Sequence, residues 1–579
     1  MNRLSKKILS LLLSFLLIFL TACAPSSPRN QLVQAILSDP KTFNAVLSQE
    51  SPNIFGLVYE GLITENPITG DKEPVLAESW TISDDKLSII VTLKKDLKWS
   101  DGQPLTIDDV LFSYNQLYLN PNIPNNYRDS FKIGKSQTFP KITKVDDRRI
   151  EFRITEPFAP FLDNLGVPIL PKHILEPTIN KKGADGRLQF LSAWGVDTPP
   201  EKIIVNGAYK LKNYSTSQRI IFEQNPNYWK KDAQGNQLPH IQQIIWAIVE
   251  SQETSLLQFR SGSLDSIGIS PEYYSLLKKE DERGNFTIFN GGPAYGVNYL
   301  SFNLNQGSRK GKPLIDPIKA KWFNNVKFRQ AIAYAIDRPR MINNIYRGLG
   351  EEQNSFMSIQ SPFYDRTLKG YEYNPQKAKE LLLEAGFKYN SNNQLVDSDN
   401  HLVRFNLITN AGNKTREAMG AQIQEDLSKI GIKVDFAPIA FNVLVDKLTN
   451  SLDWESHLLG FTGDNEPHAP NIMYVDGNLH TFNQLPQPGI PPVDGRIVYD
   501  WEKEIENLYI EGVRELDIEK RKVIYNKAQQ VLSEYLPFIY LVNPYSLAAV
   551  RNCFDGLQFS ALGGAFWNLE ELKNTCGKS

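Results

Sequence analysis

Helix-like segments that run directly into short strands are the feature that most constrains the fold of this chain. Residues 415–430 carry four apolar side chains at helical spacing: Met419, Ile423, Leu427 and Ile430. Gly431 ends this predicted helix, and residues 432–436 alternate between apolar and polar as a strand does. Helices that feed strands through a glycine turn predict an α/β architecture.

Other segments give the same reading. Asn374 is placed to cap a helix whose first residue is Pro375 and which Gly386 ends. Residues 86–94 read as a strand, and Thr106 is a plausible cap for the helix that follows the turn at 101–104. Since single cores stop growing at about 250 to 300 residues, a chain of 579 residues predicts more than one domain.

The N-terminus has the pattern of a secretory signal. Residues 8–20 form an apolar run behind a short basic leader, and this run is shorter than the about 20 residues that a membrane span needs. Leu20 to Cys23 reads Leu-Thr-Ala-Cys, which resembles a bacterial lipobox. We therefore expect a signal peptide at 1–22 and a lipid anchor on Cys23 outside the cytoplasm. The alternative is an ordinary signal peptide with a chance cysteine.

Charge and cysteine content exclude some partners. The chain has 63 basic and 65 acidic residues and no basic block, so nucleic acid is not an expected partner. With Cys23 lipidated, Cys553 and Cys576 remain of the 3 cysteines, and they could form a disulfide in an oxidising compartment. Two free thiols remain the alternative, because sequence does not show their geometry.

No catalytic constellation is present in the sequence. The nucleophile elbow, the zinc-protease motif, the phosphate loop and paired cysteine motifs are all missing, and the 6 histidines show no local metal spacing. We therefore expect a protein that is not an enzyme and that carries no cofactor or metal.

One loop carries a candidate binding group. Residues 458–470 read LLGFTGDNEPHAP, in which glycines and a proline predict a loop with Asp464 and Glu466 in an aromatic setting. The carboxylates could simply hydrogen-bond their own turn. Alternatively, Asp464 could be the counter-ion of a ligand cation, because glycines let the backbone approach a ligand closely.

Eight segments in order resemble the extracytoplasmic solute-binding proteins that serve ABC importers of oligopeptides, dipeptides and nickel. They are PVLAESW (74–80), LKWSDGQPLTIDDVLFSY (97–114), ILPKHIL (169–175), NGAYKL (206–211), NPNYW (225–229), VKFRQAIAYAIDR (326–338), IQEDLSKIGIKV (423–434) and WNLEEL (567–572). The resemblance covers nearly the whole mature chain.

The resemblance implies an α/β fold built as a two-lobed clamp with a small additional domain beside the first lobe. Lobe I would be discontinuous, with its pieces at 23–55, 171–285 and 525–579. The inserted domain would be 56–170 and lobe II 286–524. Ligand would be enclosed when the lobes close about the chain crossings between them.

The resemblance also implies a site. In peptide-binding members, an aspartate after a Gly-aromatic-x-small stretch pairs with the peptide ammonium, and here that stretch is Gly460, Phe461, Thr462 and Gly463, followed by Asp464. The backbone of 460–463 would pair with the ligand as an added strand does. Phe461 stands where the family often has tryptophan.

A second segment carries a weaker expectation. Near the mature N-terminus, Phe43-Asn44-Ala45 stands in place of the family's common Leu-Asp-Pro. Lys41, Thr42, Phe43 and Asn44 could still line the cleft through their backbone. The sequence offers no clear cationic partner for the carboxylate of a bound peptide.

The expected function is a lipid-anchored, monomeric peptide-binding protein that delivers its ligand to an ABC permease and its ATPase subunit. The same clamp could hold another solute, such as an oligosaccharide, a nickel chelate or haem. A secreted hydrolase or chaperone is a further alternative, which the missing nucleophile and metal motifs disfavour.

Overall fold

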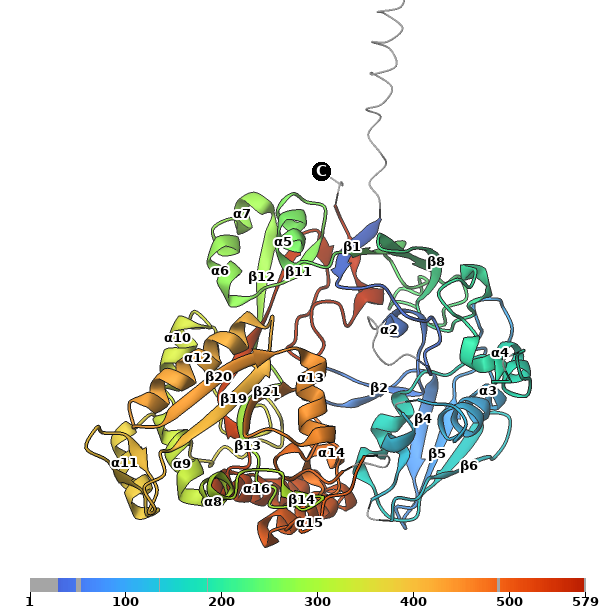
Figure 1. The fold of residues 1–579 in the computed structure, drawn as a ribbon. Helices are drawn as coiled ribbons and strands as arrows, with labels where there is room; N and C mark the ends of the chain where they lie inside the picture. Colours follow the sequence, from blue (N-terminus) through green and yellow to red (C-terminus); the bar gives the residue numbers. More distant parts are fainter. Residues whose placement is uncertain are drawn as a thin grey trace, which may run out of the picture.

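The computed structural model describes residues 30–47, 54–125, 127–134, 136–184, 186–486 and 490–576. In Figure 1 the strands β1, β8, β11 and β12 lie at the top, the sheet of β13, β19, β20 and β21 at the lower left, and the strands β4, β5 and β6 at the lower right. Both ends of the described chain lie on lobe I, where the Asn574 side chain donates to the Gln31 carbonyl oxygen at 2.6 Å. The expected signal peptide and Cys23 lie outside the described residues.

Lobe I holds two small sheets. The first has the order β1-β10-β9-β8, with β1 parallel to β10 and the other pairs antiparallel. Its strands are β1 (Gln31–Ile36), β8 (Tyr209–Ser215), β9 (Arg219–Gln224) and β10 (Gln243–Ile248). The second has the order β11-β23-β12, formed by β11 (Ser266–Gly268), β12 (Phe286–Pro293) and β23 (Val542–Arg551). The helices of this lobe are α2 (Phe55–Val58), α4 (Lys172–Ile179), α5 (Gln252–Arg260), α6 (Pro271–Lys278) and α7 (Asp281–Gly284).

The inserted domain is built on an antiparallel sheet of order β4-β5-β7-β6. Its elements are the hairpin β2 (Ile63–Glu65) and β3 (Lys72–Pro74), the strands β4 (Ala77–Ile82), β5 (Ser88–Leu93), β6 (Lys141–Lys144) and β7 (Arg149–Arg153), and the helix α3 (Ile107–Leu111). β5 confirms the predicted strand. Thr106 caps α3 as predicted, since its side chain accepts from Asp108 N–H while Asp109 completes the capping box.

Lobe II has a five-stranded mixed sheet of order β20-β19-β21-β13-β22. The strands are β13 (Val297–Phe302), β19 (Arg404–Asn410), β20 (Lys433–Ile439), β21 (Ser456–Phe461) and β22 (Ile539–Tyr540). β19 is parallel to both β20 and β21, whereas β13 is antiparallel to β21. The helices are α8 (Pro317–Asn324), α9 (Val326–Ala335), α10 (Arg338–Asn344), α11 (Pro375–Glu384), α12 (Lys414–Ser428), α13 (Phe441–Asp446), α14 (Pro470–Met473), α15 (Asp500–Arg514) and α16 (Ile518–Tyr535).

α11 confirms its predicted start, since the Asn374 side chain accepts from Lys377 N–H. In α12 the Asn413 side chain accepts from Arg416 N–H, a cap that the sequence analysis did not identify. Gly386 and Gly431 follow with φ of 89° and 80°, values that favour glycine. These helix ends therefore follow from local chemistry.

The two lobes are joined by paired strands. β12 carries the chain into lobe II and β23 carries it back, and the two pair antiparallel, with Asn290 opposite Leu547. Ala294 N–H donates to the Pro544 carbonyl at 2.8 Å where the chain passes from β12 to β13. These paired strands thus carry two chain crossings between the lobes.

The structure corrects one expected boundary. Tyr525, Leu532 and Phe538 are buried in the lobe II core, because α16 packs against α15 and β22 pairs with β13. The chain therefore leaves lobe II near Val542, and an expected return to lobe I at residue 525 is too early. The reason is that the apolar face of α16 needs the lobe II core to cover it.

Candidate functional site

The predicted ammonium-binding segment begins as a strand. Phe461 is the last residue of β21 and lies opposite Val297 of β13. The segment 458–461 is therefore strand and not loop, because β13 provides its ladder partner. On the other edge, β19 pairs with β21 only at Ser456 and His457. Within the described residues, the end of β21 thus keeps one edge without a strand partner.

Two residues after the end of β21, the chain turns toward solvent at Gly463. Its backbone passes so close to the Tyr295 carbonyl group that a methyl group on Gly463 would overlap it. Thr462, Gly463 and Asp464 are exposed. The glycine is therefore required by a close approach of two backbones, and it directs Asp464 toward solvent.

The Asp464 carboxylate keeps most of its hydrogen-bonding capacity. Its Oδ1 accepts from the backbone N–H of Asn465 at 2.7 Å. Among the residues that the structure describes, no lysine or arginine lies within ion-pair distance of Asp464. A carboxylate with this surplus capacity can accept an ammonium group from a ligand.

A cavity of about 330 Å³ adjoins this carboxylate. Its aromatic wall contains Phe461, whose ring stacks on Tyr299 at 5.0 Å and lies 6.2 Å from Phe356. The lining also includes Tyr295, Met357, Thr462, Asp464, Pro467 and Leu479. The cavity has the size and the mixed lining of a small-ligand pocket.

Glu466, the second carboxylate of the segment, has a different role. Its Oε1 lies 2.6 Å from Arg521 Nη2 of α16, and burial raises the pKa of Glu466 despite that pair. Removing either partner would leave a buried charge, so this pair anchors the base of the loop to lobe II.

The structure supplies a cation that sequence reasoning missed. Arg416 lies in the first turn of α12, with Nη2 about 2.8 Å from the position that a side-chain carbon on Gly460 would occupy. Its Nη1 donates to Asn410 Oδ1 at 3.0 Å, whereas its Nε is buried without a hydrogen-bond partner in the described part of the chain. Burial lowers the pKa of Arg416, and no carboxylate among the described residues pairs with it.

The four residues predicted at 41–44 lie elsewhere. Phe43 and Asn44 are 2% and 0% exposed. Phe43 N–H donates to the Trp194 carbonyl at 2.8 Å, and the Asn44 side chain donates to the Ala193 carbonyl at 3.3 Å. Lys41 and Thr42, like these two, are not among the residues that line the Asp464 cavity. The structure thus does not bring this segment together with Asp464.

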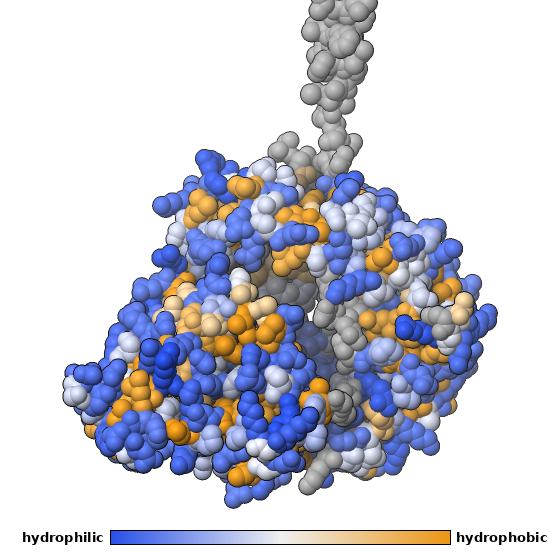
Figure 2. All heavy atoms as spheres, in the orientation of Figure 1, coloured by the Kyte–Doolittle hydropathy of each residue, from blue (hydrophilic) through white to orange (hydrophobic). Residues whose placement is uncertain are grey.

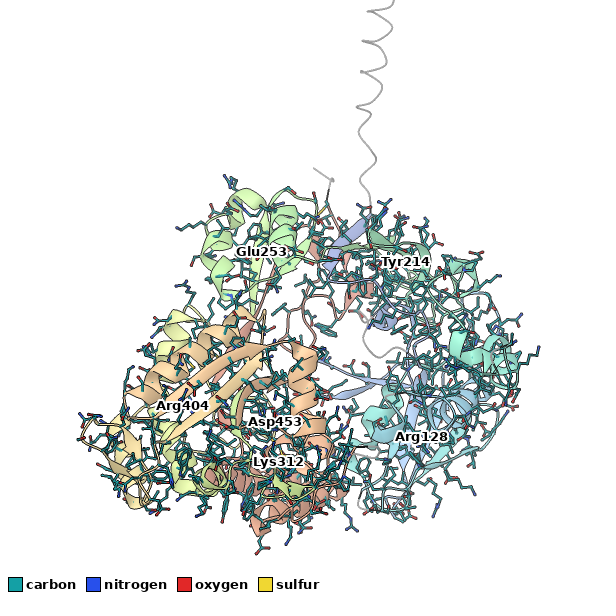
Figure 3. The ribbon with its side chains drawn as sticks, in the orientation of Figure 1. Arg128, Tyr214, Glu253, Lys312, Arg404 and Asp453 are labelled. Atoms are coloured by element: carbon teal, nitrogen blue, oxygen red, sulfur yellow. A yellow bond between two sulfur atoms is a disulfide. The ribbon has the colours of Figure 1, made fainter. Side chains whose placement is uncertain are left out.

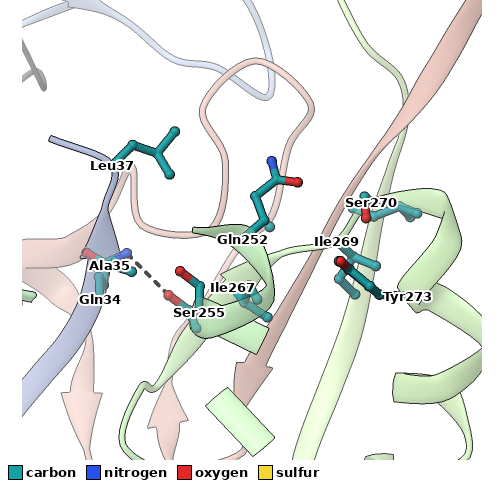
Figure 4. Close-up of a pocket in the computed structure, with 12 residues that line it drawn as sticks. Gln34, Ala35, Leu37, Gln252, Ser255, Ile267, Ile269, Ser270 and Tyr273 are labelled. Atoms are coloured by element: carbon teal, nitrogen blue, oxygen red, sulfur yellow. Dashed lines mark hydrogen bonds between the residues drawn. The ribbon is translucent and has the colours of Figure 1, made fainter. Parts of the chain in front are cut away.

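Lobe I has a further cavity of about 460 Å³ between β1, α5 and α6 (Figure 4). Two of its lining residues, Gln34 and Ser266, are joined by a hydrogen bond of 3.3 Å. Neither Asp464 nor the 41–44 segment lines it.

Cys553 and Cys576 form a disulfide, with their Cα atoms 5.0 Å apart. The bridge ties the C-terminal segment to the end of β23 in lobe I. Cys23 lies outside the described residues. The described part of the chain contains no helix that is both long enough and apolar enough to span a membrane.

The loop also contacts the inserted domain. The Asn465 side chain donates to Glu65 Oε1 at 2.6 Å, and the His468 ring meets Phe158 edge-on at 5.3 Å. In the space-filling view the face is hollowed between the three bodies (Figure 2). Asp464 is thus placed where lobe II and the inserted domain approach each other.

Comparisons with known proteins agree with this geometry. Residues 72–482 match the family model of bacterial extracellular solute-binding proteins, family 5. A probable ABC transporter-binding protein of Deinococcus radiodurans is 32% identical over 87% of this chain and 85% of that protein.

Solved structures share the fold. The oligopeptide-binding protein AppA of Bacillus subtilis, in complex with a nonapeptide, has a TM-score of 0.70 at 23% identity, covering 95% of this chain and all of that one. NikZ of Campylobacter jejuni, in complex with Ni(L-His), has a TM-score of 0.73 at 21% identity, covering 94% and 100%. Members of the family are extracytoplasmic substrate-binding proteins of ABC importers and are not enzymes. The chain belongs to the family 5 bacterial extracellular solute-binding proteins.

Proposed function

We propose that this protein binds peptides between its lobes and delivers them to an ABC permease. The observation that carries the proposal is the exposed Asp464 carboxylate, which borders a cavity and has no cationic partner among the described residues. A peptide ammonium would supply that partner, and the pair gains strength as the closed cleft excludes water.

The free edge of β21 supports an extended ligand. A peptide main chain lying beside Leu459 to Phe461 would be hydrogen-bonded like an added strand, which reads backbone rather than side chains. Such pairing would let one site accept many peptide sequences.

Arg416 completes the charge pattern of a peptide. It lies beside Gly460, four residues before Asp464, and an extended chain of four residues spans about 13 Å. We assign Arg416 to the carboxylate of a short peptide, because this half-buried arginine has no carboxylate partner among the described residues.

The test is calorimetry on the mature protein without Cys23. Tripeptides with a free amino group are compared with their N-acetylated copies, with a sugar and with a nickel–histidine complex. We expect the free-amino peptides to bind and their N-acetylated copies not to bind. Binding of only the sugar or the nickel complex would overturn the proposed cargo.

We also propose that Cys23 carries the lipid anchor. The support is the lipobox-like Leu20 to Cys23, seven residues before the first described residue of lobe I. Labelling cells with an alkyne fatty acid should mark the wild type and not Cys23→Ser, and equal labelling of both would overturn the assignment.

A further inference from the structure

The Asp464 cavity of about 330 Å³ has walls from three separate parts of the chain. They are the crossing between β12 and β13, a segment that follows β16 (Gly350–Glu352), and the chain from the end of β21 to the residues after α14. Packing of distant segments therefore builds a hollow next to the exposed carboxylate. Its lining residues with large apolar or aromatic side chains are Tyr295, Phe356, Met357, Phe461, Ile472 and Leu479.

The lining has little unpaired charge apart from Asp464. Among the described residues that form it there is no lysine or arginine. Glu466 is already paired with Arg521 at 2.6 Å, and burial lowers the pKa of His468 to about 4, so the His468 ring is neutral at pH 7. The unpaired charge of the cavity is thus confined to its Asp464 edge.

Two prolines reduce the hydrogen-bonding capacity of the wall. Pro467 and Pro470 both line the cavity, and neither has a backbone N–H to donate. A polar side chain that left water for this wall would lose hydrogen bonds, whereas an apolar side chain has none to lose. The wall therefore favours an apolar side chain over a polar one of the same size.

The apolar side chains of the wall are suited to pack against a ligand. The rings of Phe461 and Phe356 lie 6.2 Å apart, and Phe461 is held by stacking on Tyr299 at 5.0 Å. Met357 is unbranched, so it can adapt its shape to what lies beside it. An aliphatic or aromatic side chain would find both rigid and adaptable contacts here.

The position of Asp464 determines which side chain of a peptide reaches the cavity. The ammonium group and the first side chain of a peptide are attached to the same carbon atom. A peptide whose ammonium is held by Asp464 therefore starts its first side chain at the edge of the cavity. The second side chain starts about 3.8 Å further along and, in an extended peptide, points to the opposite side.

We propose that the Asp464 cavity receives the side chain of the first residue of a bound peptide and selects an apolar one, such as leucine, methionine or phenylalanine. This selection rests on the proposed function, since it requires the peptide ammonium at Asp464. The substrate class is then peptides with a large apolar N-terminal residue.

Calorimetry on the mature protein without Cys23 compares four tripeptides: Leu-Ala-Ala, Asn-Ala-Ala, Ala-Leu-Ala and Ala-Ala-Ala. The asparagine side chain has as many heavy atoms as that of leucine but is polar. Ala-Leu-Ala keeps the composition of Leu-Ala-Ala and moves the leucine by one position. Leu-Ala-Ala should bind at least about tenfold more tightly than each of the other three, because only its leucine is buried in the cavity. This comparison on the wild type needs no variant.

Phe356→Ala tests the wall itself. It removes one ring of the cavity and should reduce the affinity ratio of Leu-Ala-Ala to Ala-Ala-Ala to about threefold or less. Phe436→Ala, on β20, is the matched control. Phe436 is also a partly buried phenylalanine of lobe II, but it does not line the cavity, so its loss should leave the ratio unchanged.

The outcomes separate this selection from the proposed function. Equal affinity of Leu-Ala-Ala and Asn-Ala-Ala, or of Leu-Ala-Ala and Ala-Leu-Ala, with loss of binding on N-acetylation, would overturn the selection and leave the peptide site intact. An equal fall of the ratio in Phe356→Ala and Phe436→Ala would overturn it too, because the loss of a distant ring would then suffice. Binding of none of the four peptides would overturn the proposed function and this inference together.

Discussion

Two segments of this molecule, around Asp464 and around Phe43, were both expected to contact the ligand, but they differ in exposure. At 462–464 in lobe II the chain is exposed, and Asp464 lacks a cationic partner among the described residues. At 43–44 in lobe I the side chains are buried, and their polar groups bond to the neighbouring carbonyls of residues 193 and 194. A group whose interactions are already used to stabilise the fold has little left for a ligand.

The largest expected effect is on stability, from a substitution of Phe43. Phe43→Ala removes a buried ring that packs edge-on against Tyr214 at 5.5 Å, and it should lower the free energy of unfolding by about 3–5 kcal/mol. Peptide affinity, measured at a temperature where the variant stays folded, should not change. Leu37→Ala is the control, because Leu37 is 60% exposed and its loss should leave stability nearly unchanged. Lost affinity with unchanged stability would return the 41–44 segment to the binding site.

Asp464 should show the reverse pattern. Asp464→Ala should weaken binding of free-amino peptides by about 2–5 kcal/mol, or about 30-fold and more, because it leaves the ammonium unpaired in a closed cleft. The midpoint of thermal unfolding should stay the same. Asp453→Ala removes an exposed aspartate of the same lobe that pairs with Lys447 at 2.9 Å, and it should leave affinity unchanged (Figure 3). Unchanged affinity of Asp464→Ala would make Asp464 a solvated turn residue.

A substitution of Arg416 tests whether lobe II also binds the carboxylate of the peptide. Arg416→Met keeps the long apolar stem and removes the guanidinium, and it should cost peptides with a free carboxylate about 1.5–3 kcal/mol of binding free energy. Peptides amidated at the C-terminus should bind both proteins equally. If the wild type bound amidated and free peptides with the same affinity, the assignment of Arg416 to the carboxylate would be wrong.

Acid should destabilise lobe II, because β21, the strand that leads to Asp464, contains the buried His457. Both ring nitrogens of His457 lack partners among the described residues, and burial lowers its pKa to about 3. The unfolded chain binds this proton near pH 6.5, so stability is full above pH 6.5 and is lost as the pH falls toward 3, at about 1.4 kcal/mol per pH unit.

Denaturant unfolding at pH 7 and pH 5 tests this prediction. The wild type should lose about 2 kcal/mol of lobe II stability between these values through His457, and His457→Phe should remove that part of the loss. An equal loss in both proteins would show that His457 does not carry the acid sensitivity.

Local features of the fold could be predicted because neighbouring residues decide them. Asn374 caps a helix through its own side chain, and Gly431 ends another because its φ of 80° suits glycine. The strand that ends at Phe461 was not predicted in this way, because it depends on its pairing with β13, and Gly463 is required by the distant Tyr295 carbonyl.

The partners of the site could not be predicted, because they depend on how distant segments pack. Glu65 and Asn465, which form a hydrogen bond, are 400 residues apart in the sequence. Arg416 lies beside Gly460 only because the helix α12 packs against the strand β21. The end of lobe II near Val542 likewise depends on which core covers α16. The sequence by itself determined the family, the helix ends and the candidate carboxylate. Only the tertiary structure decided which charges surround that carboxylate, because burial and pairing are properties of the folded chain.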